Sequence, residues 1–469
     1  MKTLVLLLAL CATRMVGAQS PASPRIELAA LPDAVRGKQI ADLKWGMFIC
    51  WSFSTFSGKE WTPGVKDITL FAAKDCDTDQ WARTAREANM GYILFLTKHH
   101  DGFCLWDTQT TDRKVTKAPL GRDVLAELRQ SCDKYGIKLA LYFSEGEFSD
   151  HKNYHPGGYT AEMKKAQLKE LLTRYGPIEY IWFDHAQGTG GLSHAETDKW
   201  VRQIQPDCFS GFNNGAAAGR IVLRERGKAG PIGGEGLNWN AGQDANEKKY
   251  AYTVAEFTYP LLGKHSGAGK TGEEGADWFY SKPRYDNMCL PAKQIYNDYL
   301  GAVKFGNIFS LDVGPDYQGK LREIDVKTLR EVGKMIRGEI KVPVPLAGKA
   351  TASGCWQDDP KFGPRNATDG NPATRWGAPE HSRAGWLEID LGTTKSVSHA
   401  MADEAGFNRV RKFEILAMVN GGWQSVSSGT TLGANKEIYF PAPVNARVFR
   451  LNITGADEVP TIGEFQVFE

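Results

Sequence analysis

Short apolar runs alternate with amphipathic stretches along the first two thirds of the chain, from about residue 45 to residue 338. The amphipathic stretches predict helices over residues 79–89, 122–135, 161–175 and 324–338. The apolar runs predict buried strands, each ending in polar or charged residues: WGMFICW, YILFLTKHH, IKLALYFS and IEYIWFDHA. Successive strand–helix units over roughly 300 residues favour a (β/α)8-type barrel over an open doubly wound sheet. No dinucleotide-binding glycine fingerprint follows the first strand, which also favours the barrel.

The last third of the chain has a different pattern. Residues 341–345 contain two prolines and predict a stiff linker. After them, short alternating runs such as WLEIDL, FEILAM, VFRLNI and EFQVF are separated by Gly, Asn and Pro. This pattern predicts an all-β sandwich over residues 346–469, following a barrel domain over residues 25–340.

The first 18 residues have the pattern of a secretory signal peptide. Lys2 precedes an apolar core over residues 4–10, and Val16, Gly17 and Ala18 form a small-residue cleavage site. That core is too short to cross a bilayer, and no later segment offers the roughly 18 apolar residues of a membrane helix. We therefore expect an exported protein, periplasmic or secreted, with no membrane span.

Charge and cysteine content narrow the class of partner. Lys and Arg number 57 against 55 Asp and Glu, with no basic patch, so we expect no nucleic-acid partner. Of the eight cysteines, Cys11 leaves with the signal peptide, and the remaining seven show no CxxC spacing. We expect most of them to be small buried residues, neither disulfides nor metal ligands.

Polar residues at the ends of the predicted strands are the candidates for chemistry, because such ends meet on one face of a barrel. His99, His100 and Asp101 follow the run YILFLT. They suit a metal site, structural hydrogen bonds or contact with the hydroxyl groups of a sugar. Adjacent residues on a strand point to opposite faces, which disfavours the metal and leaves the sugar contact as our interpretation.

A carboxylate pair is the second candidate. Asp184 closes the run IEYIWF, where it is either a helix N-cap or a catalytic carboxylate. We favour the catalytic role because Trp182, two residues earlier, shares its face and suits a sugar ring. Glu235 in the run GGEG, or Glu256, is the candidate for a second carboxylate, although either could be an ordinary surface residue. Together these features point to a glycosidase.

The runs WGMFICW, KHHDGFCLW, YIWFDHAQG and GNIFSLDVGPDYQG resemble the α-L-fucosidases of glycoside hydrolase family 29 over about residues 40–340. Residues 60–61 and 103–106 look most like the subfamily that acts on branched α-1,3- and α-1,4-linked fucose. The resemblance implies a retaining exo-α-L-fucosidase that releases terminal L-fucose from a fucosylated oligosaccharide or glycoconjugate and needs no cofactor. It implies Asp184 as the nucleophile, Glu235 as the first choice for the acid/base and Glu256 as the alternative. Its implied substrate-binding residues are His99, His100, Trp182, Tyr142, Glu60, Trp61 and Trp278.

Two departures from the family pattern keep other functions open. Cys50 stands where the family usually has His, and His185 stands where Gly is common. The rival is a glycan-binding protein, or one of drifted specificity, on a fucosidase-like barrel. A third reading is a metal-dependent hydrolase using His99, His100 and Asp101.

The C-terminal region resembles a discoidin-like (coagulation-factor type C) carbohydrate-binding module. The resemblance is carried by residues 366–376, 386–392 and 462–465. It implies a structural Ca²⁺, for which oxygen ligands at this spacing are suited; a plain Asx turn is the alternative. The implied ligands are Asp369, Asn371, Thr374 and Glu464.

Overall fold

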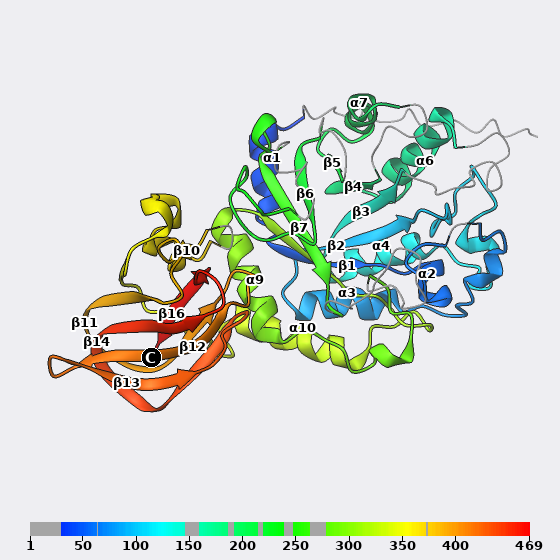
Figure 1. Cartoon of the computed structure of the whole chain (residues 1–469). Coiled ribbons are helices and arrows are strands. Elements are labelled where there is room, and N and C mark those ends of the chain that lie inside the picture. Colours follow the sequence, from blue (N-terminus) through cyan, green and yellow to red (C-terminus); the bar gives the residue numbers. More distant parts are fainter. Residues whose placement is uncertain are drawn as a thin grey trace, which may run out of the picture.

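The computed structural model describes residues 30–62, 64–145, 159–185, 192–213, 219–238, 247–262, 278–371 and 374–469. The predicted signal peptide, residues 1–18, lies outside them. The chain forms a barrel of strands surrounded by helices, with a β-sandwich at its side (Figure 1). Within the described residues, no helix is both long and apolar enough to cross a membrane.

Eight parallel strands of the described chain build the barrel, in the order β5-β4-β3-β2-β1-β8-β7-β6. They are β1 (Trp45–Ile49), β2 (Tyr92–Lys98), β3 (Lys138–Ser144), β4 (Tyr180–Asp184), β5 (Phe209–Phe212), β6 (Ile221–Glu225), β7 (Val254–Pro260) and β8 (Ile308–Asp312). At the junction of the two end strands, the backbone N–H of Arg220 donates to the carbonyl oxygen of Ser210 at 2.8 Å, which nearly closes the barrel. The predicted (β/α)8-type architecture is therefore confirmed.

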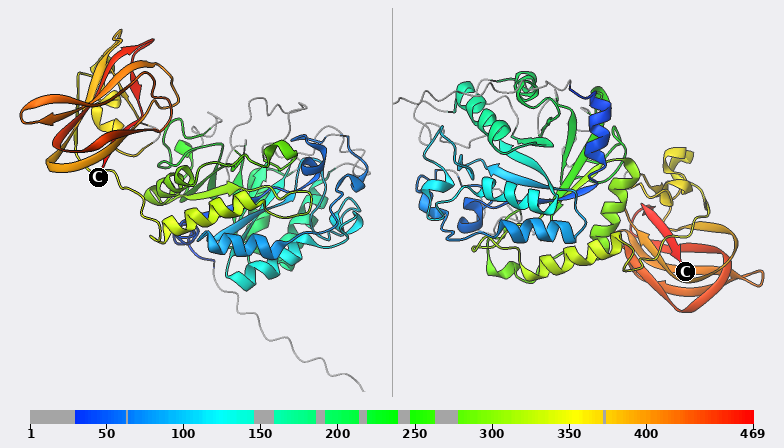
Figure 2. Two further views of the ribbon diagram at one scale, coloured as in Figure 1. Left: turned by 90° about the horizontal axis from the view of Figure 1, so that it is seen from below. Right: turned by 180° about the vertical axis from the view of Figure 1, so that it is seen from behind.

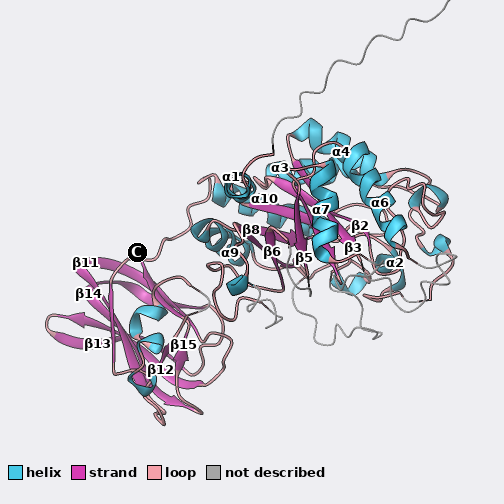
Figure 3. Ribbon diagram, turned by 90° about the horizontal axis from the view of Figure 1, so that it is seen from above, coloured by secondary structure: helices cyan, strands magenta, loops and turns pink. Residues whose placement is uncertain are grey.

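Helices cover the outside of this barrel (Figure 3). They are α1 (Asp33–Ala41), α2 (Phe53–Ser57), α3 (Thr78–Glu87), α4 (Val124–Tyr135), α6 (Ala161–Arg174), α7 (His194–Ile204), α9 (Ala292–Phe305) and α10 (Glu323–Ile336). The four helices expected from the sequence are α3, α4, α6 and α10. Their ends follow local chemistry: the Asp123 carboxylate caps the start of α4, and Gly136 ends that helix with a φ of +67°.

The strands of the barrel are buried on both faces, which explains their almost unbroken apolar runs. The seven cysteines of the described chain are free thiols, and five of them are buried, as expected for small apolar residues.

The C-terminal region is an antiparallel β-sandwich, as predicted. Its larger sheet has the order β13-β12-β14-β11-β16, with β9 paired to β11, and β10 pairs with β15. The strands are β9 (Lys349–Ala352), β10 (Trp376–Gly377), β11 (Gly385–Asp403), β12 (Val410–Val419), β13 (Gly422–Gly429), β14 (Lys436–Ala456), β15 (Thr461–Ile462) and β16 (Glu464–Phe468). The sandwich lies at the side of the barrel that carries α9 (Figure 2). Lys293 of α9 is paired with Glu437 of β14.

Candidate active site

Several of the predicted site residues meet where β2, β3 and β4 end. In the parallel register of β3 and β4, Tyr142 lies beside Trp182, and Ser144 lies beside Asp184. His100 comes two residues after the end of β2. The polar side chains therefore collect at one end of the barrel, as parallel strands require.

The Asp184 carboxylate is held by three donors. Oδ2 accepts a hydrogen bond from the Tyr142 hydroxyl at 2.6 Å. Oδ1 accepts from the backbone N–H of His185 at 2.8 Å and from Asn213 Nδ2 at 2.9 Å. The side chain is buried but not sealed, with the residue 9% exposed. Together these bonds fix the orientation of the Asp184 carboxylate.

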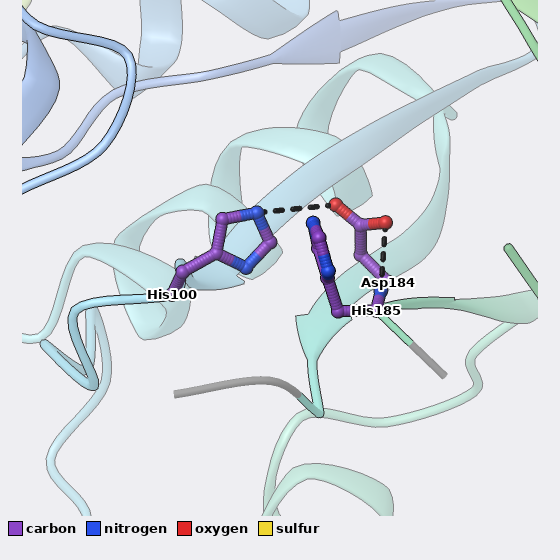
Figure 4. Close-up of side chains that lie close together, drawn as sticks. All are labelled: His100, Asp184 and His185. Atoms are coloured by element: carbon purple, nitrogen blue, oxygen red, sulfur yellow. Dashed lines mark hydrogen bonds and ion pairs between the residues drawn. The ribbon is translucent and has the colours of Figure 1, made fainter. Parts of the chain in front are cut away.

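The two neighbouring histidines lie side by side. Their ring centroids are 4.0 Å apart, and both residues are buried. The expectation that they point to opposite faces is wrong, because β2 ends at Lys98 and the strand alternation ends with it. His100 Nδ1 is hydrogen-bonded to Ser144 Oγ at 2.7 Å, which turns Nε2 to within 3.5 Å of Asp184 Oδ2 (Figure 4).

His99 and Asp101 have different surroundings. Burial, followed by the neighbouring His100, lowers the pKa of His99 well below its usual value, so this imidazole is neutral. Asp101 accepts hydrogen bonds from the Thr62 hydroxyl and from the backbone N–H of Phe103, both at 2.9 Å. Asp101 thus supports the local loop, and the cluster suited to a metal consists instead of His100, Asp184 and His185.

An aromatic wall adjoins the carboxylate. Tyr142 stacks on Trp182 with ring centroids 5.3 Å apart, and Phe48 lies 6.1 Å from Trp278 and 5.7 Å from Tyr142. Trp61 approaches the ring of His100 edge-on at 6.3 Å. Such apolar faces suit the ring and the methyl group of a deoxysugar.

The candidates for a second carboxylate differ sharply in position. Glu235 lies in the loop after β6, where its side chain is 85% exposed and pairs with Lys248 at 2.9 Å. Glu256 lies on β7 inside the barrel and accepts a hydrogen bond from Trp182 Nε1 at 3.1 Å. Burial raises the pKa of Glu256 to about 8.

Glu225, the last residue of β6, adjoins Asp184 more directly. Asn213 Nδ2 donates to Glu225 Oε2 and to Asp184 Oδ1, in both cases at 2.9 Å. These two carboxylate oxygens therefore lie no further apart than twice that distance. Retaining glycosidases hold their carboxyl groups about 5–5.5 Å apart, so this arrangement fits the retaining class.

Cys50 stands at the position where the family pattern has His, and its side chain contacts an acidic residue. Its thiol is hydrogen-bonded to Asp312, the last residue of β8. Burial and then the charge of Asp312 raise the pKa of this thiol well above its usual value, so it stays protonated. The charges of Asp184 and Glu60 add to that shift, which puts Glu60 within electrostatic reach of the site.

Asn213, Glu225 and Phe48 are site residues that were not predicted from the sequence. Glu225 ends the short run IVLRE, and Asn213 directly follows β5. The strand-end argument that selected Asp184 applies equally to them, and the signal needed was the recognition of these two short strands. Phe48 is indistinguishable by sequence from any other apolar residue of β1.

Comparison with known families agrees with this geometry. A family model described as Alpha-L-fucosidase matches residues 33–339, which is more than half of the chain. The chain belongs to the α-L-fucosidase family. It is therefore a retaining glycoside hydrolase of family 29, and the members of this family need no cofactor for the chemistry. A second model, described as F5/8 type C domain, matches residues 349–465.

Similar proteins come from plants and bacteria. A putative α-L-fucosidase 1 of Oryza sativa subsp. japonica is 28% identical, over 97% of this chain and 88% of the relative. Alpha-L-fucosidase 1 of Arabidopsis thaliana is 27% identical, over 89% of this chain and 83% of the relative. The crystal structure of a glycoside hydrolase 29 family member from a rumen bacterium is 25% identical with a TM-score of 0.56, and covers 94% of this chain and 77% of that one. A Ruminococcus gnavus GH29 fucosidase mutant in complex with fucose, 21% identical with a TM-score of 0.55 over 94% of this chain and 96% of that one, shares the fold.

The residues suited to Ca²⁺ lie together on the F5/8 type C sandwich of the fucosidase. The Thr374 hydroxyl donates to both carboxylate oxygens of Asp369, at 3.0 and 2.9 Å, and the backbone N–H of Asn371 donates to Asp369 Oδ1 at 2.8 Å. Burial and then the charge of Asp369 raise the pKa of Glu464 to about 7. Glu464 Oε1 is buried without a partner among the described residues. An orphaned carboxylate oxygen beside a second carboxylate fits a hard cation.

Proposed function

We propose that this enzyme is an exported exo-α-L-fucosidase that releases terminal L-fucose from α-1,3- or α-1,4-linked branches of glycans. The observation that carries the proposal is the Asp184 carboxylate, fixed by three donors beside His100 and the aromatic wall. The linkage rests on the sequence resemblance at residues 60–61 and 103–106. Residues 103–106 are themselves fully buried, so their support for the linkage is indirect.

Asp184 has the role of nucleophile in this proposal. Its Oδ2 attacks the anomeric carbon of fucose, the bond to the glycan oxygen breaks, and an acid donates a proton to that oxygen. Water then attacks the covalent fucosyl-enzyme, and the same residue, now a base, removes the proton from the water. Neutral His99 and the neighbouring His100 suit hydrogen bonding to fucose hydroxyls, and Trp61, Trp182 and Trp278 suit its apolar face.

The geometry supports Glu225 as the acid/base. It shares the Asn213 amide with Asp184, and so lies within the separation that retention needs. Glu235, the residue favoured by the sequence, is exposed beside Lys248, whereas a general acid needs a dry site near negative charge. Glu256 has no exposed surface and accepts a hydrogen bond from Trp182 Nε1, so it is suited to holding the indole ring in place.

Hydrolysis of an aryl α-L-fucoside and of a branched Lewis-type trisaccharide tests the proposal. Asp184→Asn should lower kcat by about 10⁴-fold or more, because it removes the nucleophile. Cleavage of the trisaccharide would support the linkage. Fucose binding with no turnover by the wild type would instead favour the glycan-binding rival.

Glu225→Gln and Glu235→Gln separate the two acid/base candidates. We expect Glu225→Gln to lose roughly 10²–10⁴-fold in kcat on the trisaccharide. It should lose much less on an aryl fucoside with a good leaving group, and azide should restore turnover by attacking the fucosyl-enzyme to give α-fucosyl azide. Glu235→Gln is the matched control, and the same behaviour in that variant would move the assignment to Glu235.

We also propose that the sandwich binds one Ca²⁺ through Asp369, Asn371, Thr374 and Glu464. The orphaned Oε1 of Glu464 supports the proposal. The ion would neutralise the two partly buried carboxylates and has no part in the hydrolysis.

A further inference from the structure

Two imidazoles and a carboxylate converge at the ends of β2 and β4. One ligand atom from each of His100, Asp184 and His185 lies within 4.8 Å of the other two (Figure 4). Imidazole nitrogen and carboxylate oxygen are the donors that Zn²⁺ and neighbouring divalent metals take, with three protein ligands and one open position.

Two of these groups are already oriented for such an ion. The bond from His100 Nδ1 to Ser144 Oγ, 2.7 Å, directs His100 Nε2 toward Asp184. A partner on the second ring nitrogen is the usual support of a metal-binding histidine. From the described residues, Asp184 Oδ1 accepts two hydrogen bonds and Oδ2 accepts one from Tyr142, so a lone pair of Oδ2 remains for a ligand beside His100.

The third group is the imidazole of His185, a residue whose backbone conformation is energetically unfavourable. Its φ is +46°, in the left-handed region where a residue with a Cβ is strained. Its ring lies perpendicular to that of His100 at 4.3 Å and 6.0 Å from Trp61. An imidazole is thus held next to Asp184 in spite of this backbone strain.

We propose that the substrate-free active site binds one divalent transition-metal ion, Zn²⁺ or a close relative, through His100, Asp184 and His185, and that the ion inhibits the enzyme. The ion takes the same lone pair of Asp184 Oδ2 that attacks the anomeric carbon. Metal and fucose therefore exclude each other, and inhibition is competitive. The inhibition rests on the proposed role of Asp184, whereas the binding of the ion does not.

Calorimetric titration of Zn²⁺ into the full mature chain, with excess Ca²⁺ present to fill the sandwich, tests the binding. We expect one Zn²⁺ per chain, displaced by excess L-fucose. His185→Gly should weaken the affinity at least about 10-fold, because one of three ligands is lost. His381→Gly is the matched control, since His381 is an exposed histidine of the sandwich with a φ of +63° and should bind Zn²⁺ as the wild type does.

Co²⁺ supplies a readout that does not depend on activity. Its visible absorption bands report nitrogen and oxygen ligands, and they should change in His185→Gly and remain in His381→Gly. In assays with an aryl fucoside, Zn²⁺ should raise KM and leave kcat unchanged.

Three results would overturn the proposal: equal Zn²⁺ affinity in wild type and His185→Gly, a Zn²⁺ site that L-fucose does not displace, or no heat of binding. Absence of turnover in the metal-free wild type would contradict the proposed function alone, because the calorimetric result would stand.

Discussion

The carboxyl group of Glu256 illustrates how burial at one strand position decides what an acidic residue can do. It lies on β7 with no exposed surface, and Oε1 has no partner among the described residues. Burial raises its pKa to about 8, and the hydrogen bonds from Ser310 and Trp182 oppose that shift only in part. At neutral pH the group is therefore protonated, and it supports Trp182 in the pocket wall.

Glu256→Gln should change how stability depends on pH. The ordinary pKa of 4.5 applies to the unfolded chain, so between pH 4.5 and about 8 only the folded protein keeps this proton. Stability of the wild type therefore falls as the pH rises through this window, by up to about 1.4 kcal/mol per pH unit, and the amide removes that slope. Urea unfolding of both proteins at pH 5 and pH 8 measures the difference.

Glu331→Gln, an exposed substitution on α10, is the control and should follow the wild type at both pH values. If the free energies of unfolding of wild type and Glu256→Gln differ equally at pH 5 and pH 8, the carboxyl group has no raised pKa.

A site residue could be predicted from the sequence only where the strand that carries it could be recognised. Asp184 and His100 follow long apolar runs whose ends converge in any parallel barrel. Asn213 follows β5 and Glu225 ends β6, and these short strands include Ser, Gly and Arg, so neither hydrophobic period nor length identifies the strands. His185 was singled out by its departure from the family pattern, but its approach to His100 depends on a φ that the sequence does not give.

At the scale of elements, a buried ion pair ties α6 to the end of β3. Lys164 Nζ lies 2.5 Å from Glu145 Oε1, and both side chains are wholly buried. The same ammonium donates to the Thr197 hydroxyl of α7 at 2.8 Å. Burial raises the pKa of Glu145 and lowers that of Lys164, while the pairing opposes both shifts. The helix was predictable from its period, but its contact with the residue that follows β3 was not.

Lys164→Met should destabilise the fold by about 3–5 kcal/mol, because it leaves a buried carboxylate without its cation. The double variant Lys164→Met/Glu145→Gln should recover part of that loss, as no charge then remains. Denaturant unfolding measures both. Lys38→Met is the control, since Lys38 pairs with Asp42 on the exposed face of α1 and should have little effect. A double variant as unstable as the sum of the two single variants would contradict the coupling.

At the scale of the whole molecule, two lysines of α9 form contacts between the barrel and the sandwich. Lys293 and Lys304 lie three turns apart on this helix and so share a face. Lys293 pairs with Glu437 of β14, and Lys304 Nζ donates to the carbonyl oxygen of Asp369. The sequence predicted both units and the proline-containing segment between them. The contacts on α9 depend on the packing of the two units, which no local pattern encodes.

The loop held by Lys304 is the one that we propose for Ca²⁺, so removal of the ion should destabilise the sandwich. Binding of an ion at 100 times its Kd stabilises a fold by about 2.7 kcal/mol. We expect a chelator to lower the calorimetric unfolding temperature of the wild type and excess Ca²⁺ to restore it. Glu464→Gln should show neither change, because it removes the charge of the orphaned carboxylate. Glu458→Gln, at an exposed glutamate of the same unit, should respond like the wild type.

Since Asp184 and Glu225 belong to the barrel, kcat on a small aryl fucoside should survive chelation below the unfolding temperature. Equal unfolding temperatures with chelator and with Ca²⁺ would mean that the loop is an Asx turn without an ion.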